Sequence, residues 1–181
     1  ITTIGWTGSP ARERVHLRKA VRFGGKVFLH TGRYNRGTIL PGFTFNPVLG
    51  CQPISRACKH CYAQALVEGR MGYANPEAKD ARHRLTLWGP PGKTARPRTA
   101  ASYWRQPLKW NERAKSIGTS LKVFCGSLCD VGEDNPDVRS VRPDLFELVD
   151  ATPYLTWLFL TKRPHVLEDE WPGRWRAAAC A

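Results

Sequence analysis

Three cysteines lie close together in the sequence, and thiols at this spacing can bind metals. Cys51, Cys58 and Cys61 form a C-x6-C-x2-C pattern in the stretch CQPISRACKHC. Thiolate sulfur is a ligand both of zinc and of iron–sulfur clusters. The chain has six cysteines and half of them are in this segment, which favours a metal site in a reducing compartment over disulfide bonds. The sequence therefore predicts a metal site in a cytoplasmic protein.

The number of thiols leaves the kind of metal open. A structural zinc site has four ligands, and Cys125, Cys129, His30 and His83 are candidates for the fourth. A [4Fe–4S] cluster normally takes four thiolates, so a cluster held by three has one iron open. An open iron can chelate S-adenosylmethionine (SAM) for radical chemistry. The spacing favours the cluster, with zinc as the main alternative and three unrelated thiols as the remaining one.

Composition and charge indicate a globular protein that attracts polyanions. The chain has 181 residues, 41% of them hydrophobic, and a formal net charge of +13. No apolar run approaches the ~20 residues that span a bilayer, so no membrane association is expected. Lys and Arg outnumber Asp and Glu in residues 1–40 and 70–123, whereas acidic residues prevail in 124–181. Nucleic acid is the expected partner, and a basic surface that only aids solubility is the alternative.

The elements that must position the cysteines follow an α/β pattern. The apolar run LTWLFLT at 155–161 is typical of a strand buried on both faces of a parallel sheet. A strand, a helix and a strand between 121 and 161 predict a βαβ unit. The predicted strands are 26–30, 42–50, 121–128 and 155–161, and the predicted helices are 62–71, 107–118 and 142–152. We expect a basic N-terminal segment over 1–40 and a cluster-binding domain over 41–181.

Polar residues directly follow the predicted strands. Since the carboxyl ends of parallel strands share one edge, these side chains should lie near the cysteines. Lys162 and Arg163 could contact a phosphate or carboxylate there, or be solvated. Asn46 could hydrogen-bond across the cysteine loop or serve a turn. Ser127 and Asp130 could be site residues or helix-entry residues, because Asp is a good N-cap.

Two basic segments are candidates for polyanion contact on the face that carries the cysteines. Trp and Tyr between arginines are residues that stack on bases, although Trp is more often a core residue. The candidates are Arg12, Arg14, Arg18, Lys19 and Arg22 in the first segment, and Lys93, Arg96, Arg98 and Arg105 with Tyr103, Trp104 and Trp110 in the second.

The cysteine block also carries a resemblance. The stretch FNPVLGCQPISRACKHCYA resembles the signature of a phage-borne family with a three-cysteine motif, related to radical-SAM enzymes. The segments YWRQPLKW, KVFCGSLCDV and TPYLTWLFLTKRP match that family in order. The resemblance implies a partial (β/α) barrel of radical-SAM type, shortened at its carboxyl-terminal end. It further implies a [4Fe–4S] cluster on Cys51, Cys58 and Cys61 and SAM as cosubstrate, with Tyr62 beside the adenine or, alternatively, in the helix core.

The function that this resemblance implies is that of a radical-SAM-like iron–sulfur protein. It would modify or repair nucleic acid in a phage or bacterial setting, in the host cytoplasm if phage-encoded. Ordinary radical-SAM enzymes space their cysteines C-x3-C-x2-C, so the six-residue gap here predicts a longer loop. The alternative is a non-catalytic zinc or cluster module, or a truncated relative, that binds nucleic acid or a host protein. The sequence names no substrate or reaction.

Overall fold

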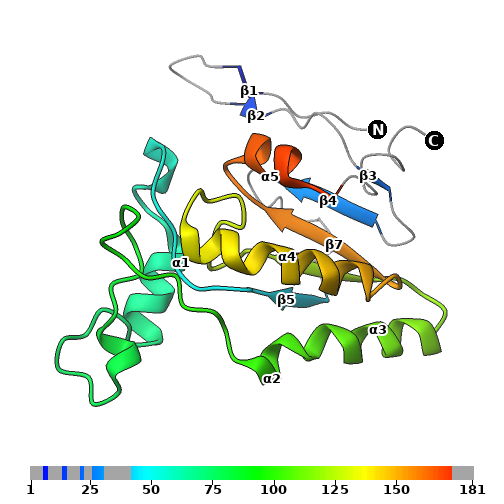
Figure 1. Cartoon of the computed structure of the whole chain (residues 1–181), viewed down its shortest axis with the longest axis horizontal. Coiled ribbons are helices and arrows are strands. Elements are labelled where there is room, and N and C mark those ends of the chain that lie inside the picture. The colour runs from blue at the N-terminus through cyan, green and yellow to red at the C-terminus, as the bar shows by residue number, and fades with distance from the viewer. Residues whose placement is uncertain (1–5, 8–13, 16–20, 23–25, 31–41, 173–181) are drawn as a thin grey trace.

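A computed structural model describes residues 6–7, 14–15, 21–22, 26–30 and 42–172 of the chain (Figure 1). Arg12, Arg18, Lys19 and Cys180 lie outside the described residues. The described strands are β1 (Trp6–Thr7), β2 (Arg14–Val15), β3 (Val21–Arg22), β4 (Lys26–His30), β5 (Phe43–Phe45), β6 (Leu121–Cys125) and β7 (Leu155–Leu160). β1 and β2 form a two-stranded antiparallel sheet by themselves.

The main sheet has the order β3-β4-β7-β6-β5. β4 is parallel to β7, β7 to β6, and β6 to β5, whereas β3 is antiparallel to β4. The predicted strands at 26–30, 121–128 and 155–161 are confirmed with small shifts at their ends, and so is their parallel arrangement. β4 comes from the basic N-terminal segment, so that segment contributes a strand to the same sheet as the cysteine motif.

The expected partial (β/α) barrel is wrong. The sheet is open: β3 and β5 stand at its two edges and are not paired with each other among the described strands. A barrel closes only when its first and last strands pair with a fixed stagger. The four parallel strands of this sheet, β4, β7, β6 and β5, are too few to close in that way. The α/β class remains, as a small open sheet with helices packed on it (Figure 1).

Most of the helices pack on the core of this sheet, and the first of them packs in a separate apolar cluster. They are α1 (Tyr62–Ala65), α2 (Ala101–Trp104), α3 (Gln106–Ser116), α4 (Pro136–Asp150) and α5 (Pro164–Glu170), with 3-10 turns η1 (Arg56–Cys58) and η3 (Ala81–Arg84) and a π turn η2 (Leu66–Arg70). α4 begins earlier than predicted because the Asn135 side chain accepts from the main-chain N–H of Asp137 and Pro136 occupies the first position. None of the described helices has the length and apolar composition needed to cross a bilayer.

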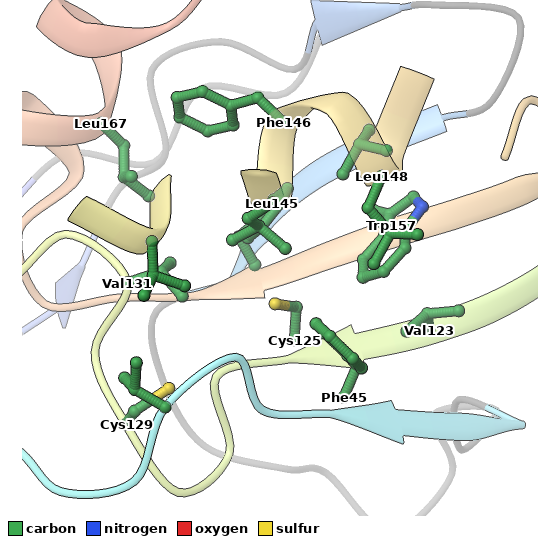
Figure 2. Packing of buried hydrophobic residues seen from close by; sticks show 14 of the residues in the cluster. Phe45, Val123, Cys125, Cys129, Val131, Leu145, Phe146, Leu148, Trp157 and Leu167 are labelled. Atoms are coloured by element: carbon green, nitrogen blue, oxygen red, sulfur yellow. The ribbon is translucent and has the colours of Figure 1, made fainter. Parts of the chain in front are cut away.

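The core of the sheet is apolar and continuous. Phe45, Cys125 and Trp157 extend from three neighbouring strands towards Leu145 of α4 (Figure 2). The ring of Phe45 meets that of Trp157 edge-on, with 5.7 Å between their centroids. Burial of each such side chain stabilises the folded state by roughly 1.5–3 kcal/mol. This core therefore supplies the frame to which the cysteine loop attaches.

Candidate functional site

The cysteine motif lies at the carboxyl edge of the parallel strands. β5, β6 and β7 end at Phe45, Cys125 and Leu160, and because they are parallel the loops that follow them meet at one edge. The loop after β5 leads into residues 49–99, called the cysteine region below. This region lies at one end of the sheet (Figure 1).

The chain reaches Cys51 through a turn that only glycine fits. The predicted strand 42–50 stops at Phe45, and Gly50 then takes a φ of +99°. A Cβ at Gly50 would lie 2.3 Å from the carbonyl oxygen of Leu87. This close approach lets the main-chain N–H of Cys51 donate to the same carbonyl at 3.1 Å. Cys51 is thereby held against the 87–89 segment, whose Gly89 N–H donates to the Cys51 carbonyl at 3.3 Å.

Cys51 has a thiol that resists ionisation. Burial raises its pKa to about 12, with further contributions from the negative charges of Asp130 and Glu133. The Arg163 guanidinium acts in the opposite direction, since it hydrogen-bonds the thiol and favours the thiolate. The thiol form of Cys51 is therefore favoured at neutral pH, and coordination to a metal would displace its proton.

Cys58 lies in the opposite electrostatic setting. It ends the 3-10 turn η1, and Lys162 donates from Nζ to its Sγ at 3.0 Å. The main-chain N–H of Ile54 also donates to this sulfur, at 3.5 Å. Burial disfavours the thiolate, but the hydrogen bonds from Lys162, Ile54 and Ser55 outweigh it and lower the pKa to about 7. The thiolate of Cys58 is therefore readily formed near neutral pH.

Cys61 is the N-cap residue of α1 and is half-buried. Together with Cys51 it packs against a small apolar cluster that is separate from the sheet core. The buried members of that cluster are Leu49, Ala63, Val67, Tyr73, Leu87 and Trp88. All three cysteines are free thiols. Within the described part of the chain, however, no three His, Cys, Asp or Glu side chains lie close enough to hold a metal ion, so the expected convergence of the three sulfurs is not reproduced.

The segment after β7 reaches two of the three thiols. Lys162 donates to the Cys58 sulfur, and the guanidinium of its neighbour Arg163 lowers the pKa of the Cys51 thiol. Arg163 is held by Asp130, with 2.7 Å between Nη1 and Oδ2. Asp130 also accepts from the Thr161 hydroxyl at 2.5 Å and from the Lys162 main-chain N–H at 3.2 Å. The loops after β6 and β7 thus meet around Asp130, as expected from the parallel strand order.

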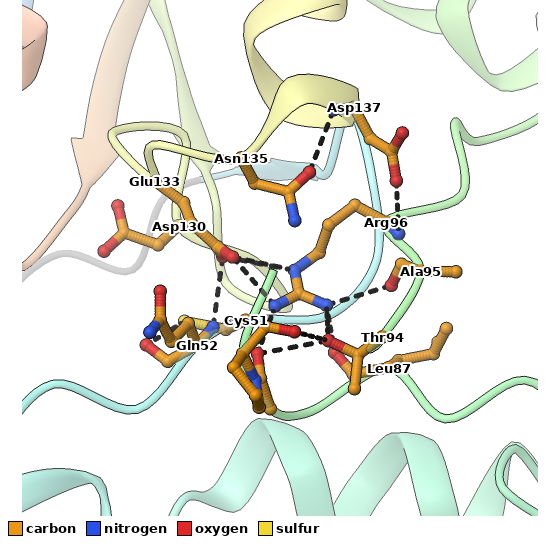
Figure 3. Close-up of polar contacts among 12 residues, drawn as sticks. Cys51, Gln52, Leu87, Thr94, Ala95, Arg96, Asp130, Glu133, Asn135 and Asp137 are labelled. Carbon is orange, nitrogen blue, oxygen red and sulfur yellow. Dashed lines mark hydrogen bonds and ion pairs between the residues drawn. The ribbon is translucent and has the colours of Figure 1, made fainter. Parts of the chain in front are cut away.

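A second buried ion pair ties the cysteine region to the loop after β6 (Figure 3). Arg96 and Glu133 approach to 2.8 Å with both side chains fully buried. Arg96 also donates to the carbonyls of Leu87 and Gly89, at 2.8 and 2.9 Å. Glu133 accepts from the main-chain N–H of Gln52 at 3.1 Å. The pair therefore joins three segments: Gln52, the 87–96 segment, and the loop between β6 and α4.

Three of the predicted polar residues form a separate network. The Asn46 side chain donates to the Ser127 hydroxyl at 3.1 Å and accepts from the Leu128 N–H at 2.7 Å. The Tyr62 hydroxyl donates to the Ser127 carbonyl at 2.8 Å, and the Tyr62 side chain is largely exposed. Asn46, Tyr62 and Ser127 therefore meet beside Cys61, and Tyr62 is not a core residue.

Several residues expected to contact a polyanion have other partners. Arg96 is buried, so its selection as a surface residue is wrong. Arg98 is half-exposed but is paired with Asp144 at 2.5 Å and lies over the ring of Trp104 at 4.0 Å. Arg105 is exposed. The aromatic side chains among them, Tyr103, Trp104 and Trp110, pack on Phe43 and Phe45 of β5 instead of offering a stacking platform.

Sequence reasoning missed Gln52 and Glu133. Glu133 follows Asp130 in an acidic stretch that reads as an ordinary helix entry, and its partner Arg96 is 37 residues away. The only local signal is that a charged residue lies close behind a buried strand, which does not indicate a partner. An ion pair between residues so far apart forms only after the sheet has brought the loop that follows β6 next to the cysteine region.

Comparisons with known proteins give one match. Neither the curated proteins nor the solved structures contain a match to the chain. The family described as "Protein of unknown function (DUF5131)" matches residues 41–177, a range that includes the cysteine region, β5 to β7 and α4. The chain belongs to this family.

Proposed function

We propose that the protein is an iron–sulfur protein that binds a [4Fe–4S] cluster through Cys51, Cys58 and Cys61. The observation that carries the proposal concerns two consecutive residues that follow β7: Lys162 donates to the Cys58 sulfur, and the Arg163 guanidinium is near enough to Cys51 to lower the pKa of its thiol. Cys51 and Cys61 in turn border the same small apolar cluster. The three thiols are therefore linked to one edge of the sheet, and in our proposal the cluster draws them together when it binds.

The chemistry of these residues suits an anionic cluster. Three thiolates are soft ligands of the kind that iron–sulfur clusters take. Lys162 and Arg163 supply positive charge and N–H donors directly at two sulfurs, and hydrogen bonds to sulfur tune the potential of such clusters. The high pKa of Cys51 fits a thiol that ionises only when metal binds.

SAM is the cosubstrate that we propose for the open iron of the cluster. A cluster with an open iron supplies one-electron chemistry to a ligand held there. Polar groups for such a ligand stand beside Cys61, in the network of Asn46, Ser127 and Tyr62. The exposed aromatic side chain of Tyr62 offers an apolar surface of the size that a purine ring needs. These chain residues would orient the ligand and limit its access to water.

Nucleic acid is the substrate class that we propose. Exposed cations in the cysteine region far outnumber the exposed anions there, which are Glu77 and Asp80. The exposed cations are Arg56, Lys59, Arg70, Lys79, Arg82, Arg84 and Lys93, whereas Arg98 is paired with Asp144. They lie on the same region as the three thiols, so a polyanion bound to them would pass near the proposed reactive centre.

Anaerobic reconstitution with iron and sulfide tests the cluster. We expect about four irons and four sulfides per chain, and loss of both in each of Cys51→Ser, Cys58→Ser and Cys61→Ser. Cys125→Ala is the control, because Cys125 is a buried core thiol of β6. A cluster that binds SAM should change its electron paramagnetic resonance spectrum when SAM is added. Iron content that is equal in all four variants, or stoichiometric zinc that iron does not replace, contradicts the proposal.

Salt-dependent binding of single-stranded and duplex oligonucleotides tests the substrate class. The double substitution Arg56→Gln/Lys59→Gln removes two exposed cations of the cysteine loop. We expect weaker binding and a salt slope that is smaller by about two. Arg139→Gln is the control, because Arg139 is an exposed cation on α4, away from the cysteines, and is paired with Asp134. If binding by both variants and by the unmodified protein has the same salt dependence, the proposal is contradicted, and the basic charge serves solubility only.

A further inference from the structure

Two buried ion pairs converge on Gln52, the residue that follows Cys51. Glu133 accepts from the Gln52 main-chain N–H at 3.1 Å, and Arg163 donates from Nη2 to the Gln52 carbonyl at 2.9 Å. The two charged residues come from different loops, after β6 and after β7. Both polar main-chain atoms of one residue are therefore held by charged side chains, and each of those side chains is itself paired, with Arg96 or with Asp130.

The burial of these pairs makes stability a poor explanation for them. The Arg96 and Glu133 side chains are fully buried, and the Arg163 and Asp130 side chains are 8% and 5% exposed. Removing two charges from water costs about as much as their attraction returns, so a well-packed apolar pair is often as stable or more stable. What an apolar pair could not provide is a hydrogen bond to Gln52.

We propose that Glu133 and Arg163 are positioning residues, which hold the N–H and the carbonyl of Gln52 and thereby set the orientation of Cys51 towards the other two cysteines. The reason for this positioning rests on the proposed function, but the positioning itself is a property of the metal-free chain.

Both anchors belong to the sheet edge and not to the cysteine region. Glu133 follows β6 and Arg163 follows β7, and the two strands are paired directly. The Cys51 loop is thus hydrogen-bonded to the loops that follow two directly paired strands, and Figure 3 shows the contact with Glu133. A ligand loop that is fixed in this way keeps its geometry in the absence of metal, which is how supporting hydrogen bonds usually act around metal ligands.

A matched pair of double variants separates positioning from ion pairing. Glu133→Gln alone would leave the buried Arg96 charge unpaired and could unfold the protein. The variants Arg96→Met/Glu133→Gln and Arg96→Met/Glu133→Leu both remove the two charges. They differ in one respect: Gln retains an oxygen that can accept from Gln52, and Leu does not. Any electrostatic effect of the lost carboxylate on Cys51 is the same in both.

The readout is the alkylation rate of each cysteine in the metal-free, full-length protein, measured by mass spectrometry under native conditions. We expect Cys51 to react about tenfold faster in the Leu variant than in the Gln variant, because losing a hydrogen bond to the main chain lowers the free energy of local opening. Cys58 and Cys61 provide the comparison within the motif. Cys125 of β6 is fully buried in the sheet core and reports general unfolding.

Each outcome decides the proposal. Selective acceleration of Cys51 in the Leu variant supports positioning. Equal Cys51 rates in the two variants overturn it, and so does a parallel acceleration of Cys51 and Cys125, which would indicate a merely structural role. Because the experiment uses metal-free protein, its result stands even if reconstitution yields no cluster. If a cluster does form, the Gln variant should retain the electron paramagnetic resonance spectrum of the unmodified protein and the Leu variant should not.

Discussion

The sheet and the cysteine region are held together by different forces. The sheet core is a large apolar cluster in which Phe45, Leu145 and Trp157 are almost completely buried. The cysteine region has a much smaller apolar cluster, and its regular structure is limited to short helical turns. Buried charged residues, Arg96 and Arg163, connect it to the loops of the sheet. The difference indicates that burial stabilises the frame, whereas specific polar contacts place the thiols.

The largest effect is expected in the sheet. Trp157→Ala should lower the free energy of unfolding by about 3–5 kcal/mol, because a fully buried aromatic ring is lost and a cavity remains. Chemical denaturation measures this loss. Since the cysteine region is anchored to the sheet, alkylation of Cys51 and of Cys125 should accelerate together. Tyr154→Ala is the control, because Tyr154 precedes β7 but is 44% exposed, and it should change stability by less than about 0.5 kcal/mol.

A smaller and more local effect is expected at Gly50. Gly50→Ala places a Cβ 2.3 Å from the Leu87 carbonyl oxygen in a backbone with a φ of +99°, which should cost about 1–3 kcal/mol. Limited proteolysis should then cut within residues 51–99 while Cys125 stays protected. Gly69→Ala has open space around its Cβ and serves as the control. Uniform loss of protection across both regions would contradict the separation that we describe.

The smallest effect is expected at the hydrogen bond between Lys162, which follows β7, and Cys58 of the cysteine region. Cys58 alkylation should rise with pH through about 7, because the thiolate is the reactive form and its pKa lies there. Lys162→Met removes a hydrogen bond that favours the thiolate, so the pKa should rise and the rate at pH 7 should fall roughly fivefold, as the thiolate fraction does when a pKa near 7 rises by about one unit. Lys59→Met changes an exposed lysine of the same loop and should have little effect. Cys51, with a pKa of about 12, should stay nearly unreactive at pH 7 in all of these proteins.

Much of the frame could be predicted from local patterns. The apolar run at 155–160 and the β-favouring run at 121–125 are strands, and they are parallel as a fully buried run suggests. The placement of Lys162 and Arg163 near the cysteines follows from that order. The prediction of a barrel was wrong because a resemblance carried by short motifs does not fix the number of strands in the sheet, which is open. The strand expected over 42–50 was too long because Asn46 is held by the distant Ser127 and Leu128, and Pro47 has no N–H to donate to a neighbouring strand.

The amino-acid sequence sufficed for features that depend on neighbours in the chain: the thiol spacing, the apolar runs, and the glycine that allows a sharp turn. Tertiary structure decided which charges meet. Arg96 reads as a surface cation because most arginines are exposed, yet it is buried against Glu133, 37 residues away. Arg163 is buried against Asp130, 33 residues away. Such pairs form only when parallel strands bring their loops to one edge, so the environment of each cysteine is set by residues that no local pattern can identify.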